Sequence, residues 1–262
     1  MALPRGSRNT RPSHVLMRRI WLPSPAFEGE LARLEDAPSH RVRDVWRLRS
    51  GTDLCVFDGA GHERAATVES VSPRAVTLAL GEAVEPLPEP QRPLVLGCAF
   101  PRGSRGDWLV EKATELGAAR LIALDTGRAV LRPGSGRLGR WRRVAIEAAE
   151  QCGRAVVPSI SVASFGAGPE VLGTSTLLLA DPTADATIAE AVSLIPADEG
   201  TPAALLVGPE GGWTLEEREH WIKAGARPAS LGPRVLRVET AAVVGLVQLA
   251  EATCRSAHSH RS

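Results

Sequence analysis

The residues with the clearest capacity for chemistry form two glycine-bearing loops in the last quarter of the chain. One is Gly208–Gly212, with the sequence GPEGG, and the other is Leu231–Arg234, with the sequence LGPR. Each comes at the end of a short apolar run, Ala204–Val207 or Ala229–Leu231, of the length typical of a buried parallel strand. Open α/β sheets bind ligands at the carboxyl ends of such strands, and glycine lets the backbone approach a ligand closely.

The familiar phosphate-binding motifs are absent from both loops. Neither contains the GK[ST] of a Walker A loop, and no G-x-G-x-x-G follows a strand. The two loops therefore predict a pocket built from backbone groups and apolar side chains, for a ligand that is not mainly phosphate.

An ordered set of further motifs accompanies these loops. GPEGG is followed about twenty residues later by LGPRVLRVETAA, and both are preceded by HRVRDV at 40–45, FDG at 57–59, KATELG at 112–117, and EQCGR at 150–154 with Val157-Pro158. In this order and spacing the chain resembles the 16S ribosomal RNA (uracil-N3)-methyltransferase family of the SPOUT superfamily, over roughly Arg18 to Leu249. One GPEGG alone would be weak evidence, whereas the ordered set is specific.

The resemblance implies a fold, a cofactor and a substrate. The fold is α/β, a SPOUT-type mostly parallel sheet with a C-terminal trefoil knot, preceded by a small PUA-like β-barrel domain. The cofactor is S-adenosylmethionine, and the substrate is a uridine of 16S ribosomal RNA, methylated at N3 in the assembled 30S subunit. Two subunits pair beside the knot, so the resemblance also implies a homodimer.

The cofactor pocket implied by the resemblance involves both loops and the end of a third strand. Two positions depart from the family pattern, since Asp181-Pro182 stands where histidine-proline is usual, and Val238 stands where threonine is usual. Ala180 and Asp181 are expected to extend a third wall of the pocket. The expected cofactor-binding residues are Leu179, Gly208, Pro209, Gly211, Gly212, Leu231, Gly232, Leu236 and Thr240.

Four charged residues beside the loops are the candidate catalytic groups, namely Glu210, Arg234, Arg237 and Glu239. Uracil N3 carries a proton, so a general base or a group that stabilises negative charge on the base should help. An arginine can stabilise charge on O2 or O4 or hold a phosphate. Glu239 can equally be a helix-start residue paired with an arginine, and Glu210 is the other candidate base.

A crowd of arginines around the turn at 133–136 is a candidate RNA contact. Such a run is also typical of a solvated face, and both interpretations stay open; an RNA contact would weaken steeply as salt rises. Arg102 and Arg105 lie in the PRGSRGD loop, and Arg154 can equally be structural. The expected RNA-binding residues are Arg18, Arg19, Arg102, Arg105, Arg132, Arg137 and Arg154.

Composition limits the alternatives. The formal net charge of the 262-residue chain is +1, so bulk electrostatics do not indicate nucleic acid, and only two of the thirty-one basic residues, Lys112 and Lys223, are lysine. The four cysteines have no C-x-x-C spacing and are expected to be reduced, with no metal site. We expect no signal peptide and no membrane span, and a cytoplasmic location.

The chain is expected to form two domains. Residues 1–14 read as a disordered extension, 15–85 as the PUA-like β-barrel that binds RNA, 86–93 as a proline-rich linker, and 94–255 as the SPOUT methyltransferase domain. Short strands predominate before the linker, and strands alternate with helices after it. Asp107 is expected to cap one helix and Thr214-x-x-Glu217 to open another.

The final helix is apolar nearly all round, because only Gln248 is polar between Ala241 and Ala250. Such a helix must be buried, by deep packing or at a subunit interface. Two other functions remain open from sequence alone. One is a SPOUT methyltransferase for another RNA nucleotide, and the other is an inactive RNA-binding ribosome-assembly factor.

Overall fold

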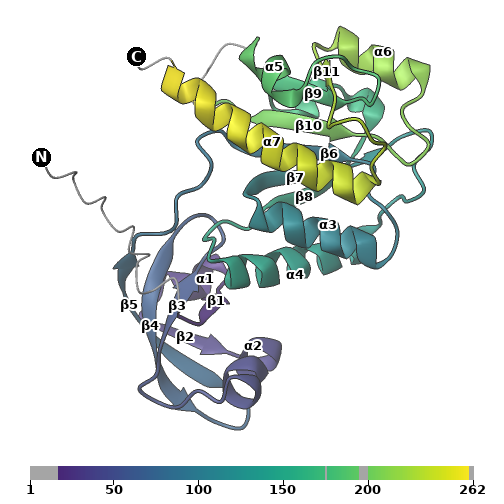
Figure 1. Ribbon diagram of the computed structural model, residues 1–262. Helices are drawn as coiled ribbons and strands as arrows, with labels where there is room; N and C mark the ends of the chain where they lie inside the picture. Colours follow the sequence, from purple (N-terminus) through teal and green to yellow (C-terminus); the bar gives the residue numbers. More distant parts are fainter. Residues whose placement is uncertain (1–16, 175, 195–199, 260–262) are drawn as a thin grey trace, which may run out of the picture. The chain divides into compact units, whose positions relative to one another are not determined.

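The computed structural model describes residues 17–174, 176–194 and 200–259. The chain divides into two compact units, Met1–Leu87 and Pro88–Ser262, each with its own buried core (Figure 1). The division falls inside the proline-rich segment 86–93. The segment 1–14, expected to be disordered, lies outside the described residues.

The first unit is a curled, mixed five-stranded sheet with strand order β1-β3-β4-β5-β2. β1 pairs parallel to β3, and the other neighbours are antiparallel. Its core is formed by apolar residues of the strands, with Ile20, Leu54 and Leu78 fully buried. The strands are β1 (Arg19–Trp21), β2 (Leu31–Leu34), β3 (Asp53–Phe57), β4 (Glu63–Val71) and β5 (Val76–Val84).

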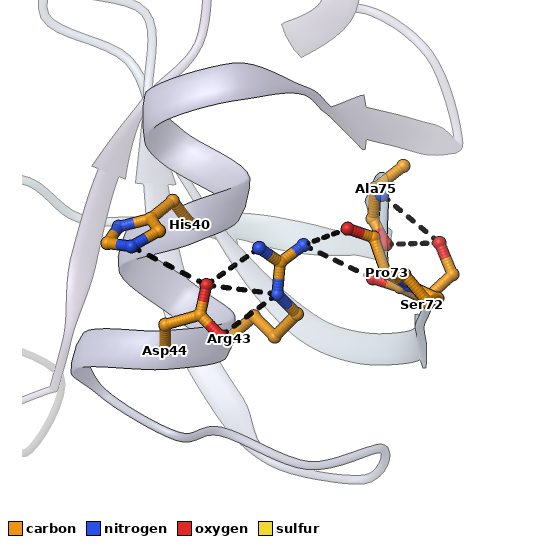
Figure 2. A network of polar contacts seen from close by, with 6 residues as sticks. All are labelled: His40, Arg43, Asp44, Ser72, Pro73 and Ala75. Atoms are coloured by element: carbon orange, nitrogen blue, oxygen red, sulfur yellow. Dashed lines mark hydrogen bonds and ion pairs between the residues drawn. The ribbon is translucent and has the colours of Figure 1, made fainter.

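A helical segment of this unit is tied to the turn between β4 and β5. It comprises α2 (Asp36–His40) and the π-helical turn Arg41–Val45 that continues it, whereas α1 (Ser24–Phe27) is a separate turn between β1 and β2. Figure 2 shows Arg43 donating to Asp44 at 2.6 Å and to the carbonyl of Pro73 at 2.5 Å, with His40 3.6 Å from Asp44. The hydrogen bond from Arg43 holds the pKa of Asp44 below its usual value. The network is solvent-exposed, so it fixes a local geometry and adds little stability.

The second unit is built on a six-stranded, wholly parallel sheet with strand order β11-β9-β10-β6-β7-β8. The mostly parallel sheet expected from the alternating pattern is therefore confirmed. The strands are β6 (Leu94–Cys98), β7 (Ala118–Asp125), β8 (Ser159–Ser164), β9 (Thr176–Ala180), β10 (Ala203–Val207) and β11 (Arg227–Ala229).

Helices cover both faces of this sheet (Figure 1). Because side chains alternate along a strand, Leu94 and Leu96 join the core with α3, α4, α5 and α7, while Val95 joins the core with α6. The helices are α3 (Ser104–Glu115), α4 (Ser135–Cys152), α5 (Ile188–Ser193), α6 (Leu215–Lys223) and α7 (Val238–Ser259), with 3-10 turns at Phe165–Ala167 and Pro169–Leu172.

Two predicted helix starts have different outcomes. The capping box is confirmed, since Thr214 accepts from the backbone of Glu217 and the Glu217 side chain accepts from the backbone of Thr214. The predicted cap at Asp107 is wrong. Gly103, with a φ of +67°, turns the chain so that α3 begins at Ser104, which leaves Asp107 in the first turn.

The final helix, α7, lies across the middle of the sheet against β10 and β6 (Figure 1). It packs tightly on β10 at Gly245, where an added Cβ would lie 2.4 Å from Leu205 Cδ2. Leu246 and Leu249 are fully buried, but Val247 is 38% exposed, so the single chain does not bury this helix on every side. Within the described ranges no helix is long and apolar enough to cross a membrane.

The substitution Gly245→Ala tests the close packing of α7. The added methyl group must displace Leu205 in a filled core, so we expect the free energy of unfolding to fall by about 1–3 kcal/mol, measured by chemical denaturation. Gly139→Ala is the matched control, because a Cβ there meets nothing within 4 Å. The control should be neutral or stabilising by about 0.5–1 kcal/mol. Equal stability of both variants would contradict the packing.

Candidate active site

Three loops that follow neighbouring strands enclose a cavity of about 340 Å³. They are the segment after β9, the glycine loop after β10 and the glycine loop after β11. Val238 and Ala241 of α7 complete the lining. The volume is in the lower part of the range of small-molecule sites, and the carboxyl edge of a parallel sheet is a usual place for one.

Most of the expected cofactor residues meet in this cavity. Gly208, Pro209, Gly212, Leu231, Gly232 and Leu236 line it. Three others do not. Leu179 is fully buried in the core on the α6 face of the sheet, Thr240 is exposed on the first turn of α7, and Gly211 lies against the side chain of Arg128.

Two of the glycines have a structural reason, one in the backbone conformation and one in the space left by a neighbouring ring. Gly232 has a φ of +120°, a conformation that side chains with a Cβ rarely adopt. At Gly208 the ring of Trp213 occupies the space of a side chain, because an added Cβ would lie 2.9 Å from Trp213 Cε2. Trp213 also lines the cavity, so glycine at position 208 is what lets this indole form a wall. Trp213 has no signal in the sequence motif.

An ion pair forms the third wall. Arg218 of α6 donates from Nε to Asp181 Oδ2 at 2.8 Å, and Thr183 donates from its backbone and hydroxyl to Asp181 Oδ1 at 2.8 and 2.6 Å. Burial would raise the pKa of Asp181, but the hydrogen bonds from Thr183 and Arg218 outweigh it and hold the pKa below its usual value. Ala180 and Asp181 were expected at this wall, whereas Arg218, 37 positions from its partner, was not.

The four candidate catalytic residues occupy different environments. Glu210 and Arg234 line the cavity, whereas Arg237 is exposed outside its lining. Glu239 is buried in the first turn of α7. Arg105 of α3 connects the two carboxylates, with its Nη1 3.2 Å from Glu210 Oε1 and 3.7 Å from Glu239 Oε1.

Cys98 ends β6 close to these carboxylates. Burial raises the pKa of the Cys98 thiol well above its usual value, and the negative charges of Glu239 and Glu210 raise it further. The residue is therefore a neutral thiol at physiological pH and does not supply a thiolate nucleophile. Cys55, Cys98 and Cys152 have free thiols, and the described part of the chain contains no cluster of three or more histidine, cysteine or acidic residues that could hold a metal ion.

The loop after β7 braces the first glycine loop. Arg128 Nη1 donates to the carbonyl of Gly211 at 2.7 Å. The backbone of Gly127 donates to Glu217 Oε1 at 2.7 Å, and the other oxygen of this buried carboxylate closes the capping box of α6. These contacts join segments about ninety residues apart, so motif analysis could not have found them.

The expected RNA-binding arginines divide by exposure. Arg18, Arg102, Arg105 and Arg132 are exposed, and Arg137 is half-buried in a shallow hollow with Arg140. Arg19 is buried against Glu63, and Arg154 is buried against Glu89 and the carbonyls of Thr114 and Ala118. The burial of Arg19 and Arg154 favours structural roles over contact with a bulky polyanion.

Comparisons with known proteins agree on one family. A family model described as an RNA methyltransferase domain matches residues 88–250. The ribosomal RNA small subunit methyltransferase E of Synechocystis sp. is 33% identical over 257 residues, which cover 95% of this chain and 82% of that protein. The protein of the same name from Bacillus subtilis is 26% identical, over 82% of this chain and 90% of its own.

Solved structures give the same result. The chain is similar to the ribosomal RNA small subunit methyltransferase E of Neisseria gonorrhoeae bound to S-adenosyl methionine, with a TM-score of 0.79, 26% identity, and coverage of 90% of this chain and 97% of that one. It is also similar to a methyltransferase of Legionella pneumophila in complex with the bound cofactor SAM, with a TM-score of 0.81, 29% identity, and coverage of 90% and 98%.

The substitution Asp181→Asn tests the ion pair of the cavity wall. The folded-state pKa of Asp181 is depressed, so its stabilising contribution is present above the reference value of 3.8 and is lost as pH falls through the folded pKa. We expect wild type to be more stable than the variant at neutral pH, and the difference to shrink as pH falls below 3.8. Urea denaturation at a series of pH values measures it, and a difference independent of pH would contradict the role.

Proposed function

Since the chain belongs to the ribosomal RNA small subunit methyltransferase E family, we propose that it methylates N3 of a uridine in 16S ribosomal RNA, with S-adenosylmethionine as methyl donor. The family membership indicated by the motifs is confirmed. The observation that carries the proposal is the single cavity formed by the GPEGG and LGPR loops. The substrate form is the assembled 30S subunit, and the location is the cytoplasm, where these particles are made.

The cavity suits this cofactor. Backbone groups of the two glycine loops, with Leu231, Leu236 and Trp213, provide a mostly apolar enclosure for a nucleoside. Asp181 is on the lining, where its negative charge complements a sulfonium. S-adenosylmethionine supplies an electrophilic methyl group when bound.

The protein's own residues bind and orient the two reactants and stabilise the charge on the target base. Positioning of two reactants can contribute about 7–11 kcal/mol in favourable cases, and the three loops that line the cavity would hold the donor. Arg234, on the cavity lining, is placed to stabilise negative charge on the target base, and Arg237 to hold a phosphate of the RNA nearby. The remaining cofactor candidates, Leu179, Gly211 and Thr240, support the pocket from outside its lining.

RNA contact is proposed for the exposed arginines. Arg102, Arg105, Arg132 and Arg137 belong to segments that follow β6 and β7, so they are on the same edge of the sheet as the cavity. In the first unit, Arg18 stacks on Trp46, with its guanidinium 5.2 Å from the ring centroid. Because the net charge of the chain is only +1, recognition depends on these local groups.

Three finer features follow from the family and are part of the proposal. The first unit is a PUA-like barrel for RNA, at about 15–85, and the segment 94–255 is the SPOUT catalytic domain. The C-terminal segment is a trefoil knot. It is supported by the path of the chain, which runs from the edge strand β11 to helix α7 over the central strands β10 and β6. The active form is a homodimer. It is supported by two exposed apolar side chains, Val247 on α7 and Trp108 on α3, because helices α3 and α7 contact each other.

The decisive test uses a bacterial host that lacks its own 16S rRNA (uracil-N3)-methyltransferase. We expect expression of this chain to restore one N3-methyluridine in 16S rRNA, detected by nucleoside mass spectrometry and primer extension. A methyl mark at another nucleotide would indicate a different RNA methyltransferase. Failure to bind S-adenosylmethionine in calorimetry would indicate an inactive assembly factor.

Gly208→Ala is the matched loss-of-function variant. Its Cβ would displace Trp213 from the cavity wall, so we expect the Kd for S-adenosylmethionine to rise at least about tenfold, a loss of about 1.4 kcal/mol. Gly136→Ala is the control, since a Cβ there meets nothing within 4 Å. If both variants bind the cofactor as wild type does, the cavity is not the cofactor site.

The proposed dimer predicts a mass of twice 27.8 kDa in light scattering after size-exclusion chromatography. Val247→Glu should shift the protein towards the monomer, because it adds a charge to the exposed apolar strip of α7. Val71→Glu is the control, since Val71 of the first unit is equally exposed, at 38%. A monomeric wild type, or equal effects of both changes, would rule out this interface.

A further inference from the structure

The carboxylate of Glu239 is an unusual buried charge. Its side chain is 9% exposed, and among the described residues its Oε2 is buried without a hydrogen-bond partner. A buried carboxylate is costly unless a cation or a donor compensates it. The nearest compensation is the guanidinium of Arg105, at 3.7 Å from Oε1. Glu239 therefore forms an ion pair with Arg105 on the first turn of α3.

Arg105 in turn holds a second carboxylate. Its Nη1 is 3.2 Å from Oε1 of Glu210, which belongs to the glycine loop after β10. Three elements are joined in this way, namely the start of α3, the loop after β10 and the start of α7. The Arg105 side chain is 43% exposed, so a large substrate can reach it.

Glu210 differs from Glu239 in access. It lines the cavity and its side chain is 39% exposed. Among the described residues only its Oε1 has a partner, which leaves Oε2 available. Oε2 of Glu239, in contrast, has almost no accessible surface, and the thiol of Cys98 is neutral and buried. Glu210 is thus the one member of this cluster with a free acceptor oxygen on the cavity.

We propose that Glu210 accepts the proton of the target nitrogen, and that Arg105, anchored by Glu239, is the positioning residue that holds Glu210 for this step. The inference rests on the proposed function and adds the identity of the base. It also changes the role of Arg105 from a general RNA contact to a residue that acts through Glu210.

The step balances as follows. The proton on uracil N3 moves to Oε2 of Glu210, and the N3 electron pair forms the bond to the methyl carbon. The electron pair of the methyl–sulfur bond remains on sulfur, which becomes a neutral thioether. Glu210 then releases its proton to water. No oxidant, reductant or metal is required.

Glu210→Gln removes the acceptor and keeps the shape. We expect kcat on 30S subunits to fall by about 10²–10⁴-fold, while the Kd for S-adenosylmethionine and the KM for the subunits change by less than about threefold. Glu216→Gln is the matched control, an exposed glutamate six positions along the chain and outside the cavity lining, and it should keep wild-type kcat. Loss of cofactor binding, or a kcat within about threefold of wild type, would overturn the assignment.

A more acidic substrate separates a base from a structural residue. Fluorine at C5 of uracil makes the N3 proton easier to remove, so catalysis depends less on a base. With 5-fluorouridine at the methylated position, the deficit of Glu210→Gln relative to wild type should shrink. An unchanged deficit would show that Glu210 does not handle this proton.

The ion pair between Arg105 and Glu239 is tested by thermal stability, which does not depend on catalysis. Arg105→Ala leaves Glu239 buried without its cation, so the Tm of the cofactor-free protein should fall, and adding Glu239→Gln should restore it. On 30S subunits, Arg105→Ala should lower kcat more than it raises KM. Two results would assign Arg105 to RNA binding alone. One is a Tm of the double variant below that of Arg105→Ala, and the other is an effect of Arg105→Ala confined to KM and its salt dependence.

The two levels of proposal fail differently. If wild type forms no N3-methyluridine, the proposed function fails. If wild type is active and the Glu210 and Arg105 variants behave as their controls do, only the assignment of the base fails.

Discussion

Parallel pairing of β9, β10 and β11 is the constraint on which the site depends. β10 and β11 both pair with β9 in parallel register, so the three loops that follow them emerge at one edge of the sheet. Residues of the segments 180–183, 208–210, 212–213, 231–232 and 234–236 are far apart in the sequence but line one cavity for this reason. β9 and β10 are short and almost wholly apolar, and burial on both faces fixes their alignment.

Side chains from other elements hold these loops in place. Arg128 binds the carbonyl of Gly211, Glu217 binds the backbone of Gly127, and Arg218 binds Asp181. Each contact joins two segments at the carboxyl edge of the sheet. Ion pairs such as Arg218–Asp181 and Arg105–Glu210 are at the edge where a cationic cofactor and an anionic RNA are proposed to meet. Such pairing keeps the edge ordered while leaving individual acceptors, such as Oε2 of Glu210, available.

The final helix connects the core to the site. Small residues at Ala242 and Gly245 let α7 lie close to β10, and the first turn of the same helix carries Val238 on the cavity wall and Glu239 beneath Arg105. Close packing of α7 on the sheet thus determines where Val238 and Glu239 lie in the site. A helix that must approach the sheet this closely can tolerate little increase in side-chain volume.

Local signals in the sequence determined most elements of the second unit. β10 was predicted to within one residue from the apolar run Ala204–Val207, and the capping box of α6 was predicted from Thr214 and Glu217. These features depend on hydrogen bonds and burial patterns within a few residues. β8 was missed because its short, serine-rich strand contains no fully buried apolar residue, and the cap at Asp107 was wrong because a glycine with positive φ began the helix earlier.

Tertiary structure alone decided which side chains serve the site. Trp213 fills the space beside Gly208, Arg218 reaches Asp181 across 37 positions, and Arg105 joins Glu210 to Glu239. It also placed Arg19 and Arg154 in the interior, although their residue type favoured an RNA surface. The physical reason is that residue type and spacing report local conformation and burial periodicity, whereas the partner of a charge depends on which distant segments the sheet brings to the same edge.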